Sequence, residues 1–232
     1  MATLCRSFSR STRMRLTRLD ACGAPAPGTT GSLVTSGFVN VDYTPNYLDP
    51  EDITQPNANG DLCIDDQGRP QLRWLDLSIV LCQIDPVAVN VITGNPLVVD
   101  DATPTPNNVG FRINGELDST ASFALEVWSG IANQQCVTGA REYGYWLLPY
   151  IVKARVGAWS IANAALNLTL TARTSAGSQW GTGPTAYTVR ADAVTATPEK
   201  ILTAIDDTDH VHFEVVKVAP PAVLCGGSVL AA

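Results

Sequence analysis

The chain has 232 residues, of which 45% are hydrophobic, and its 22 acidic and 15 basic side chains give a formal net charge of −7. This length allows one large β domain or two small ones, with ample apolar material for a core. No apolar run approaches the ~18 residues of a membrane span, so we expect a soluble protein without a membrane partner.

Residues 1–19 form a basic segment with five arginines and no acid. Its Arg- and Ser-rich start superficially resembles a transit peptide, but it runs directly into an alternating segment, residues 13–17, typical of a strand. We therefore expect a basic structural arm that becomes the first strand, able to bind phosphate or an acidic patch on a neighbouring copy. The remaining residues carry a net charge of −12, which disfavours nucleic acid on the body of the protein. The arginines are Arg6, Arg10, Arg13, Arg15 and Arg18.

A Pro/Gly-rich loop at 21–28 precedes a predicted strand over Leu33–Tyr43. Regular alternation then stops from Thr44 to Pro70, a stretch with four prolines, an Asn-Gly turn, and six acids against a single arginine. Long loops without their own structure are usually functional or disordered. Scattered apolar residues argue against disorder here, so we expect residues 44–70 to be a binding loop. Its acids are Asp49, Glu51, Asp52, Asp61, Asp65 and Asp66.

The clearest secondary-structure pattern lies at Leu75–Leu81, where every odd position is apolar, as in a strand with one face on a core. Asp85 and Pro86 then supply an N-cap and a first helical residue, and Gly94 stands where a helix over Pro86–Thr93 needs a left-handed residue. A long strand followed by one capped helix predicts a sheet with a single helix packed against it.

The rest of the chain is dominated by strand patterns. They predict a hairpin turning at Asn114-Gly115, five strands and a short helical turn. The strands are Ser122–Ser129, Tyr145–Val156 with an edge or bend at Pro149, Ile161–Ala172, Tyr187–Ala191 and Val211–Val218, and the helical turn is Pro198–Ile205. Without a repeat or a linker, these patterns predict a single all-β domain over 1–232, a β-sandwich or open barrel with one short flanking α-helix and long loops.

No pattern predicts an enzyme, a cofactor or a metal site. His210, His212 and Glu214 would share one side of a strand, and His-x-His pairs do bind metals, but a polar turn leading into a solvated strand face is the better explanation for them. We expect both histidines to be structural. The cysteines at 5, 22, 63, 82, 136 and 225 have no zinc-like spacing and are expected to be unpaired, with one or two disulfides as the alternative.

Several stretches, taken together and in order, resemble the major tail protein, the tail-tube subunit, of long non-contractile-tailed phages that infect actinobacteria. They cover nearly the whole chain. The stretches are the Arg-rich first strand with residues 19–25, residues 57–63, 82–86 with 93–94, 123–128, 180–184 and 209–212.

This resemblance implies a tail-tube-like β-sandwich with one flanking helix, assembled as rings of six that stack into a hollow tube for double-stranded DNA. It further implies a virion protein that assembles in the host cytoplasm and contacts the tape-measure protein, the tail terminator and the tail-tip proteins. DNA would pass through without specific binding. The alternative is an adhesin-like β-sandwich on a virion surface that binds carbohydrate through Trp128, Trp146, Trp159 and Trp180.

Two surface hypotheses follow from charge. Arg6, Arg10 and Arg13 are expected to meet Asp49, Glu51 and Asp52 of another copy between rings. A lumen that passes a polyanion should be neutral or negative, because a positive wall would hold phosphates. Asp76, Ser78 and Glu126 stand opposite the apolar rows of their strands and are the predicted lumen wall, with outer solvent as the other place for them.

Overall fold

The fold is taken from a computed structural model that describes residues 5–27, 30–116, 120–132, 141–184, 187, 189–191 and 197–230. It is mostly antiparallel β-structure with one short helix, which confirms the predicted fold class. The main sheet contains β1 (Phe8–Leu19), β2 (Thr30–Thr35), β3 (Phe38–Leu48), β6 (Gln71–Leu81), β9 (Ser122–Ile131), β10 (Tyr143–Val156), β11 (Leu168–Thr174), β14 (His212–Val216) and β15 (Leu224–Val229). Three two-stranded ribbons are β4 (Ile53–Pro56) with β5 (Leu62–Asp66), β7 (Leu97–Val99) with β8 (Asn108–Phe111), and β12 (Arg190–Ala191) with β13 (Pro198–Glu199).

The strand order of the main sheet is β15-β2-β1-β9-β10-β11-β6-β3, and β14 pairs with β10 beside this path. β10 therefore changes partners along its length, from β14 at Tyr143–Leu147 to β11 at Ile151–Val156. Pro149 lies in the register shift between Leu148 and Ile151. Proline has no backbone N–H to donate, and at such a break in the pairing no ladder hydrogen bond is lost. This position therefore accommodates the bend that the sequence predicts at Pro149.

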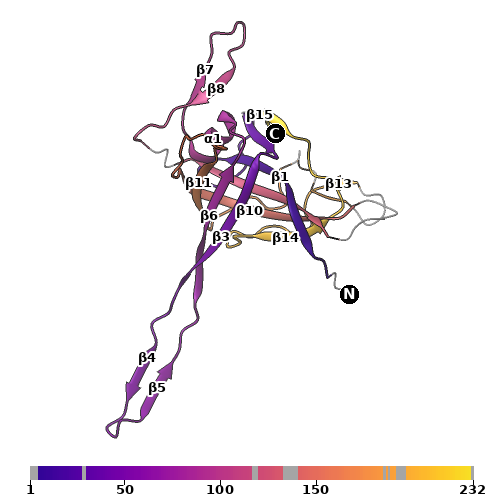
Figure 1. The fold of residues 1–232 in the computed structure, drawn as a ribbon. Coiled ribbons are helices and arrows are strands. Elements are labelled where there is room, and N and C mark those ends of the chain that lie inside the picture. The colour runs from indigo at the N-terminus through magenta and orange to yellow at the C-terminus, as the bar shows by residue number, and fades with distance from the viewer. Residues whose placement is uncertain are drawn as a thin grey trace.

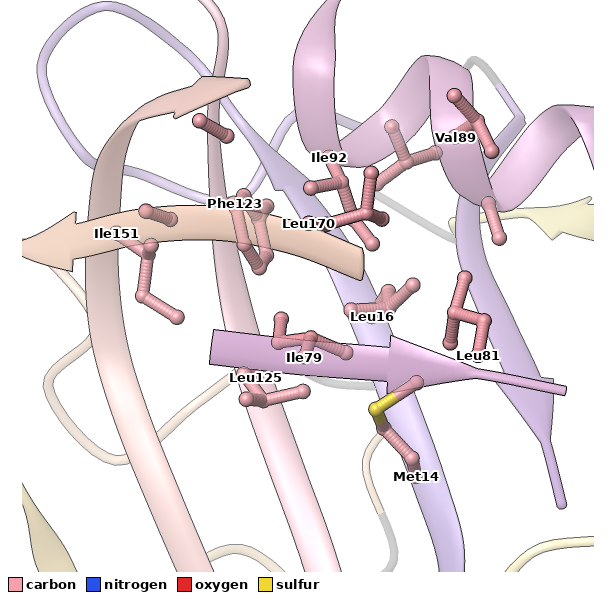
Figure 2. Close-up of a cluster of buried hydrophobic side chains, with 14 of the residues drawn as sticks. Met14, Leu16, Ile79, Leu81, Val89, Ile92, Phe123, Leu125, Ile151 and Leu170 are labelled. Atoms are coloured by element: carbon pink, nitrogen blue, oxygen red, sulfur yellow. The ribbon is translucent and has the colours of Figure 1, made fainter. Parts of the chain in front are cut away.

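The first core lies where the sheet curls around α1 (Pro86–Thr93). Figure 2 shows Val89 and Ile92 of the helix together with strand side chains of the same cluster, among them Leu16, Ile79 and Phe123. All three of these strand residues are fully buried. Burying such side chains stabilises the fold by roughly 1.5–3 kcal/mol each.

The helix ends are those the sequence predicts. The Asp85 side chain accepts a hydrogen bond from the Val87 N–H at 2.8 Å, and Gly94 adopts φ 72° while its N–H bonds to the Asn90 carbonyl. Gly94 is a position where glycine is needed, because other L-residues are strained at positive φ.

A second core covers the opposite face of β1, β9 and β10. It contains Trp128, Tyr145 and Leu147 from the strands, together with residues of the segment from Trp180 to Ile205 that lies over them. Successive residues of β9 alternate between the two cores, and the first eight residues of this strand are all buried. β9 therefore has no solvated face, although its sequence alternates.

Four sequence predictions of local structure were wrong. The predicted strand 33–43 is two strands, β2 and β3, and the strand predicted from Ile161 begins only at Leu168. Within the described residues, β8 pairs with the preceding β7 and not across the turn expected at Asn114-Gly115, whose second strand falls partly on residues 117–119 outside the description. Residues 198–205 contain β13 in place of the predicted helical turn. In each case the pairing partner, which local periodicity does not encode, decided the outcome.

Two hairpins project from the body, β3–β6 with its tip ribbon β4–β5 and the shorter β7–β8 (Figure 1). The prediction of an irregular binding loop at 44–70 was wrong about structure. Residues 44–48 extend β3, and β4 and β5 continue the ribbon to a turn at Asn57–Asp61, where Gly60 has φ 89°. Alternation fails here because both faces of the ribbon are in water, so no core imposes a period of two.

Candidate assembly surfaces

The distal part of the long hairpin, residues 49–70, is called the hairpin arm from here on. Apart from the partly buried Pro50, every residue of the arm is exposed, and within the described residues none of its six acids forms an ion pair. It also carries three large apolar side chains in water, with exposed fractions of 60% for Ile53, 63% for Leu62 and 49% for Ile64. An ordered, acidic and partly apolar projection is typical of a surface that another molecule covers.

The pairing of β4 with β5 sorts the arm into two faces. Ile53 stands opposite Asp66, and Gln55 opposite Ile64, so these four residues share one face. Leu62 pairs with Pro56 beyond a register shift that follows Gln55, so alternation does not assign it to this face, and it lies next to the turn at the tip. We call Ile53, Leu62 and Ile64 the apolar stripe. The sequence signal for it was the apolar residues scattered through the loop, but the common face of Ile53 and Ile64 follows only from the cross-strand register.

The basic segment is less available to partners than its charge of +5 predicts. Arg6 donates to Glu142 at 2.8 Å, Arg15 is buried against Glu126, and Arg18 donates to the Asn90 side chain. Arg10 is exposed and Arg13 half-buried, and no ion pair to either is seen within the described residues. Of the three arginines predicted at the inter-ring contact, the structure leaves Arg10 and Arg13 as the better candidates.

Arg15 and Glu126 form a buried, two-pronged ion pair in the second core, with both N···O distances at 2.6 Å. The Tyr145 hydroxyl also donates to Glu126 at 2.6 Å, and the Arg15 guanidinium lies 3.6 Å from the ring centre of Tyr187. Burial and the neighbouring Glu126 charge raise the pKa of Tyr145 well above its ordinary value, so the hydroxyl stays a donor.

Glu126 is therefore not a lumen-wall residue, and that prediction was wrong. Its side chain is on the face opposite Phe123, Leu125 and Val127, as alternation requires, but that face is covered by the second core, and Glu126 is 0% exposed. Alternation separates the two faces of a strand and does not tell which of them is solvated.

Asp76 and Ser78 lie on the polar face of the β3–β6–β11 part of the sheet, away from the first core. Asp76 is exposed, Ser78 is half-buried, and their cross-strand neighbours are Thr44 and Asp42 on β3 and Arg173 and Thr171 on β11. The face mixes both charges, since Arg173 stacks on Trp74 and Asp76 accepts a hydrogen bond from the Trp74 indole.

The edge of this sheet is open at β3. This strand has 11 residues and pairs with β6 alone, so its outer edge has no strand partner within the described part of the chain. A long open edge is a template for pairing with another chain unless it is covered. Sequence reasoning missed this edge because strand order is a property of the whole fold.

The two histidines contact different residues. His210 Nδ1 is 2.8 Å from the Thr174 hydroxyl, while His212 is 3.6 Å from Glu214. In the described residues, no group of three or more His, Cys, Asp or Glu side chains is arranged to hold a metal ion. Five cysteines are free and exposed, Cys5, Cys22, Cys63, Cys82 and Cys225, whereas Cys136 lies outside the described residues.

The tryptophans offer little surface for a sugar. Trp128 and Trp180 are buried at 0% and 4% exposure, and Trp146 packs on Phe8 and Phe213. Trp159 is half exposed. The stacking platform expected of the carbohydrate-binding alternative is therefore not assembled from the four tryptophans named for it.

Neither a protein-family model nor a curated protein matches this chain. No helix in the described part of the chain is long and apolar enough to span a membrane.

Proposed function

We propose that this protein is a self-assembling structural subunit whose copies form stacked rings, and that the assembly is a phage tail tube. The observation that carries the proposal is the hairpin arm, an ordered projection with an uncovered apolar stripe and a net negative charge, on a chain whose first strand exposes cations. A projection of this kind extends beyond its own subunit, and contacts with a neighbouring subunit would stabilise it.

The open edge of β3 from Thr44 to Leu48 supports lateral contacts between copies. Edge-to-edge pairing within a closed ring would cover the strand on every subunit and remove the aggregation risk of an exposed edge. Contacts through the arm join two different surfaces, the arm of one copy and another part of the next copy. When such head-to-tail contacts do not close into a ring, they continue from copy to copy as an open stack. Ring closure by edges and stacking by arms together produce a tube.

The finer parts of the proposal come from the resemblance described above. They are six subunits per ring, a lumen that passes double-stranded DNA without specific binding, and location in the virion after assembly in the host cytoplasm. Contacts with the tape-measure protein inside the tube and with the terminator and tail-tip proteins at its ends belong to the same proposal. Asp76 and Ser78 remain the proposed wall residues, because their face of the sheet is polar and partly solvated.

The test is the state of the purified protein at increasing concentration, followed by light scattering and negative-stain electron microscopy. Rings or filaments of uniform width are the expected result. A protein that stays monomeric at all concentrations, at low and high salt, would contradict the proposal. A monomer that also binds a glycan array would favour the carbohydrate-binding alternative.

A further inference from the structure

A groove of about 640 Å³ lies between the first half of β1 and the start of β3. Its lining includes Phe8, Arg10, Phe38, Val39, Tyr43 and Trp146. Val39 is 57% exposed and Tyr43 is 38% exposed, so apolar side chains of the groove are in water. The volume is large enough for several aliphatic side chains of a partner.

The groove exists because two strands lack neighbours there. Within the described residues, β1 pairs with β2 only from Met14 to Thr17, so its residues 8–13 are bonded to β9 alone, and β3 is bonded to β6 alone. The β1 edge is irregular, with register shifts on both sides of Ser11 and Arg10 at φ 52°. An edge broken by a bulge is a poor template for adding a strand, and the groove therefore suits docking of side chains better than β-pairing.

We propose that this groove receives the apolar stripe of the hairpin arm, Ile53, Leu62 and Ile64, from a second copy of the chain. The inference rests on the proposed self-assembly and names the surfaces that meet. Both surfaces are apolar and exposed, and their contact would remove both from water.

Charge favours the same occupant. Arg10 is the charged side chain among the described residues that line the groove, and Arg13 lies three residues farther along β1. The arm has six acids against Arg69, and Asp66 shares the face of Ile53 and Ile64. The groove is apolar with a cation, and the stripe is apolar with carboxylates nearby, so the two surfaces are complementary in charge. Ion pairs across an interface contribute more to the choice of partner than to affinity.

The arm cannot reach the groove of its own subunit. Tyr43 lines the groove and Ile53 begins the stripe, and ten residues of extended chain separate them by roughly 33 Å. The hairpin runs straight away from the body over this distance (Figure 1). The occupant must therefore be another copy, and the contact joins unlike surfaces, as propagation of a stack requires.

Photo-crosslinking tests the contact directly. The photoreactive amino acid benzoylphenylalanine replaces Val39 in the groove, and a matched control replaces Val109 on β8, which is equally exposed at 57%. Irradiation of a mixture of ¹⁵N-labelled and unlabelled protein should join position 39 to residues 53–64 of a different copy. The control at position 109 should not reach these residues.

Charge exchange gives a second readout. Arg10→Glu and Asp66→Arg should each raise the concentration needed for assembly about tenfold at low salt, and the double exchange should restore it. Unchanged unfolding midpoints show that the variants are folded. Crosslinks from position 39 to its own chain, including residues 1–7, or to any segment other than the arm, would overturn the groove assignment.

The groove assignment and the proposed function fail in different ways. Rings or filaments without the crosslink from position 39 to the arm would overturn the groove and leave self-assembly intact. A protein that neither assembles nor crosslinks at any concentration would overturn both.

Discussion

The body around β9 and the hairpin arm differ in where their charged side chains lie: the body buries and pairs them, and the arm leaves them exposed. In the body, Arg15 and Glu126 are withdrawn from water and held by each other and by Tyr145. In the arm, six carboxylates and the apolar stripe are left in water. Charges that serve the fold are paired within the subunit, and charges left exposed on an ordered projection remain available to a partner.

This contrast predicts that mutations in the two regions have separable effects: the body controls unfolding, and the arm controls assembly. Changes in the body should lower stability in every state of the protein. Changes in the arm should leave the isolated subunit untouched, because almost all of the arm's side-chain surface is exposed.

The largest effect is expected from Arg15→Met, which leaves Glu126 buried without its cation. Breaking a buried pair on one side costs about 3–5 kcal/mol, and denaturant unfolding of the soluble subunit should show this loss. The double variant Arg15→Met with Glu126→Leu should recover most of it, since it leaves no unpaired charge. A single variant as stable as the native chain would show that the pair contributes nothing.

Next is the triple change of Asp49, Glu51 and Asp52 to serine in the arm. We expect an unchanged unfolding midpoint and assembly that needs about tenfold more protein at low salt, with the difference shrinking as salt is added. Sedimentation at several ionic strengths measures both. Serine at two exposed acids outside the arm, Asp101 and Glu116, is the control. An equal effect in the control would mean that net charge alone matters.

A smaller effect is expected from Asp76→Lys on the polar face of β6. The residue is exposed, so the fold should be retained, while a cation facing a lumen would hold phosphates and slow DNA ejection from assembled particles severalfold. Asp101→Lys is the control on the β7–β8 hairpin. Ejection kinetics that are identical for the native chain and Asp76→Lys would place this face outside the lumen.

The smallest effect concerns His210, whose pKa is lowered by partial burial, with Asp209 acting in the opposite direction. Below its ordinary pKa of 6.5, the unfolded chain takes up this proton more readily than the folded one, so stability should fall slightly as the pH drops through this range. His210→Gln should flatten that slope while assembly at pH 7.5 stays unchanged. Unfolding midpoints between pH 5 and 7.5 are the measurement.

The contrast between body and arm also separates what sequence could predict. Local chemistry was sufficient for the strand at Leu75–Leu81 and for the helix with Asp85 and Gly94 at its ends. These features depend on neighbours within one or two turns of chain, where periodicity and capping operate. The all-β class followed from the same local patterns.

Long-range pairing decided the rest. Glu126 alternates with Phe123, Leu125 and Val127 in sequence, which would suit a solvated face. A segment more than fifty residues away covers that face and excludes water from it. Residues 44–70 lost their alternation because neither face of their ribbon meets a core, and so an ordered hairpin was predicted as an irregular loop. The groove beside Val39 arises from two strands that lack neighbours. The sequence by itself determined which residues alternate and where the helix begins and ends, because those depend on adjacent side chains. Only the tertiary structure decided which faces are covered and which edges stay open, because burial depends on segments that are distant in the chain.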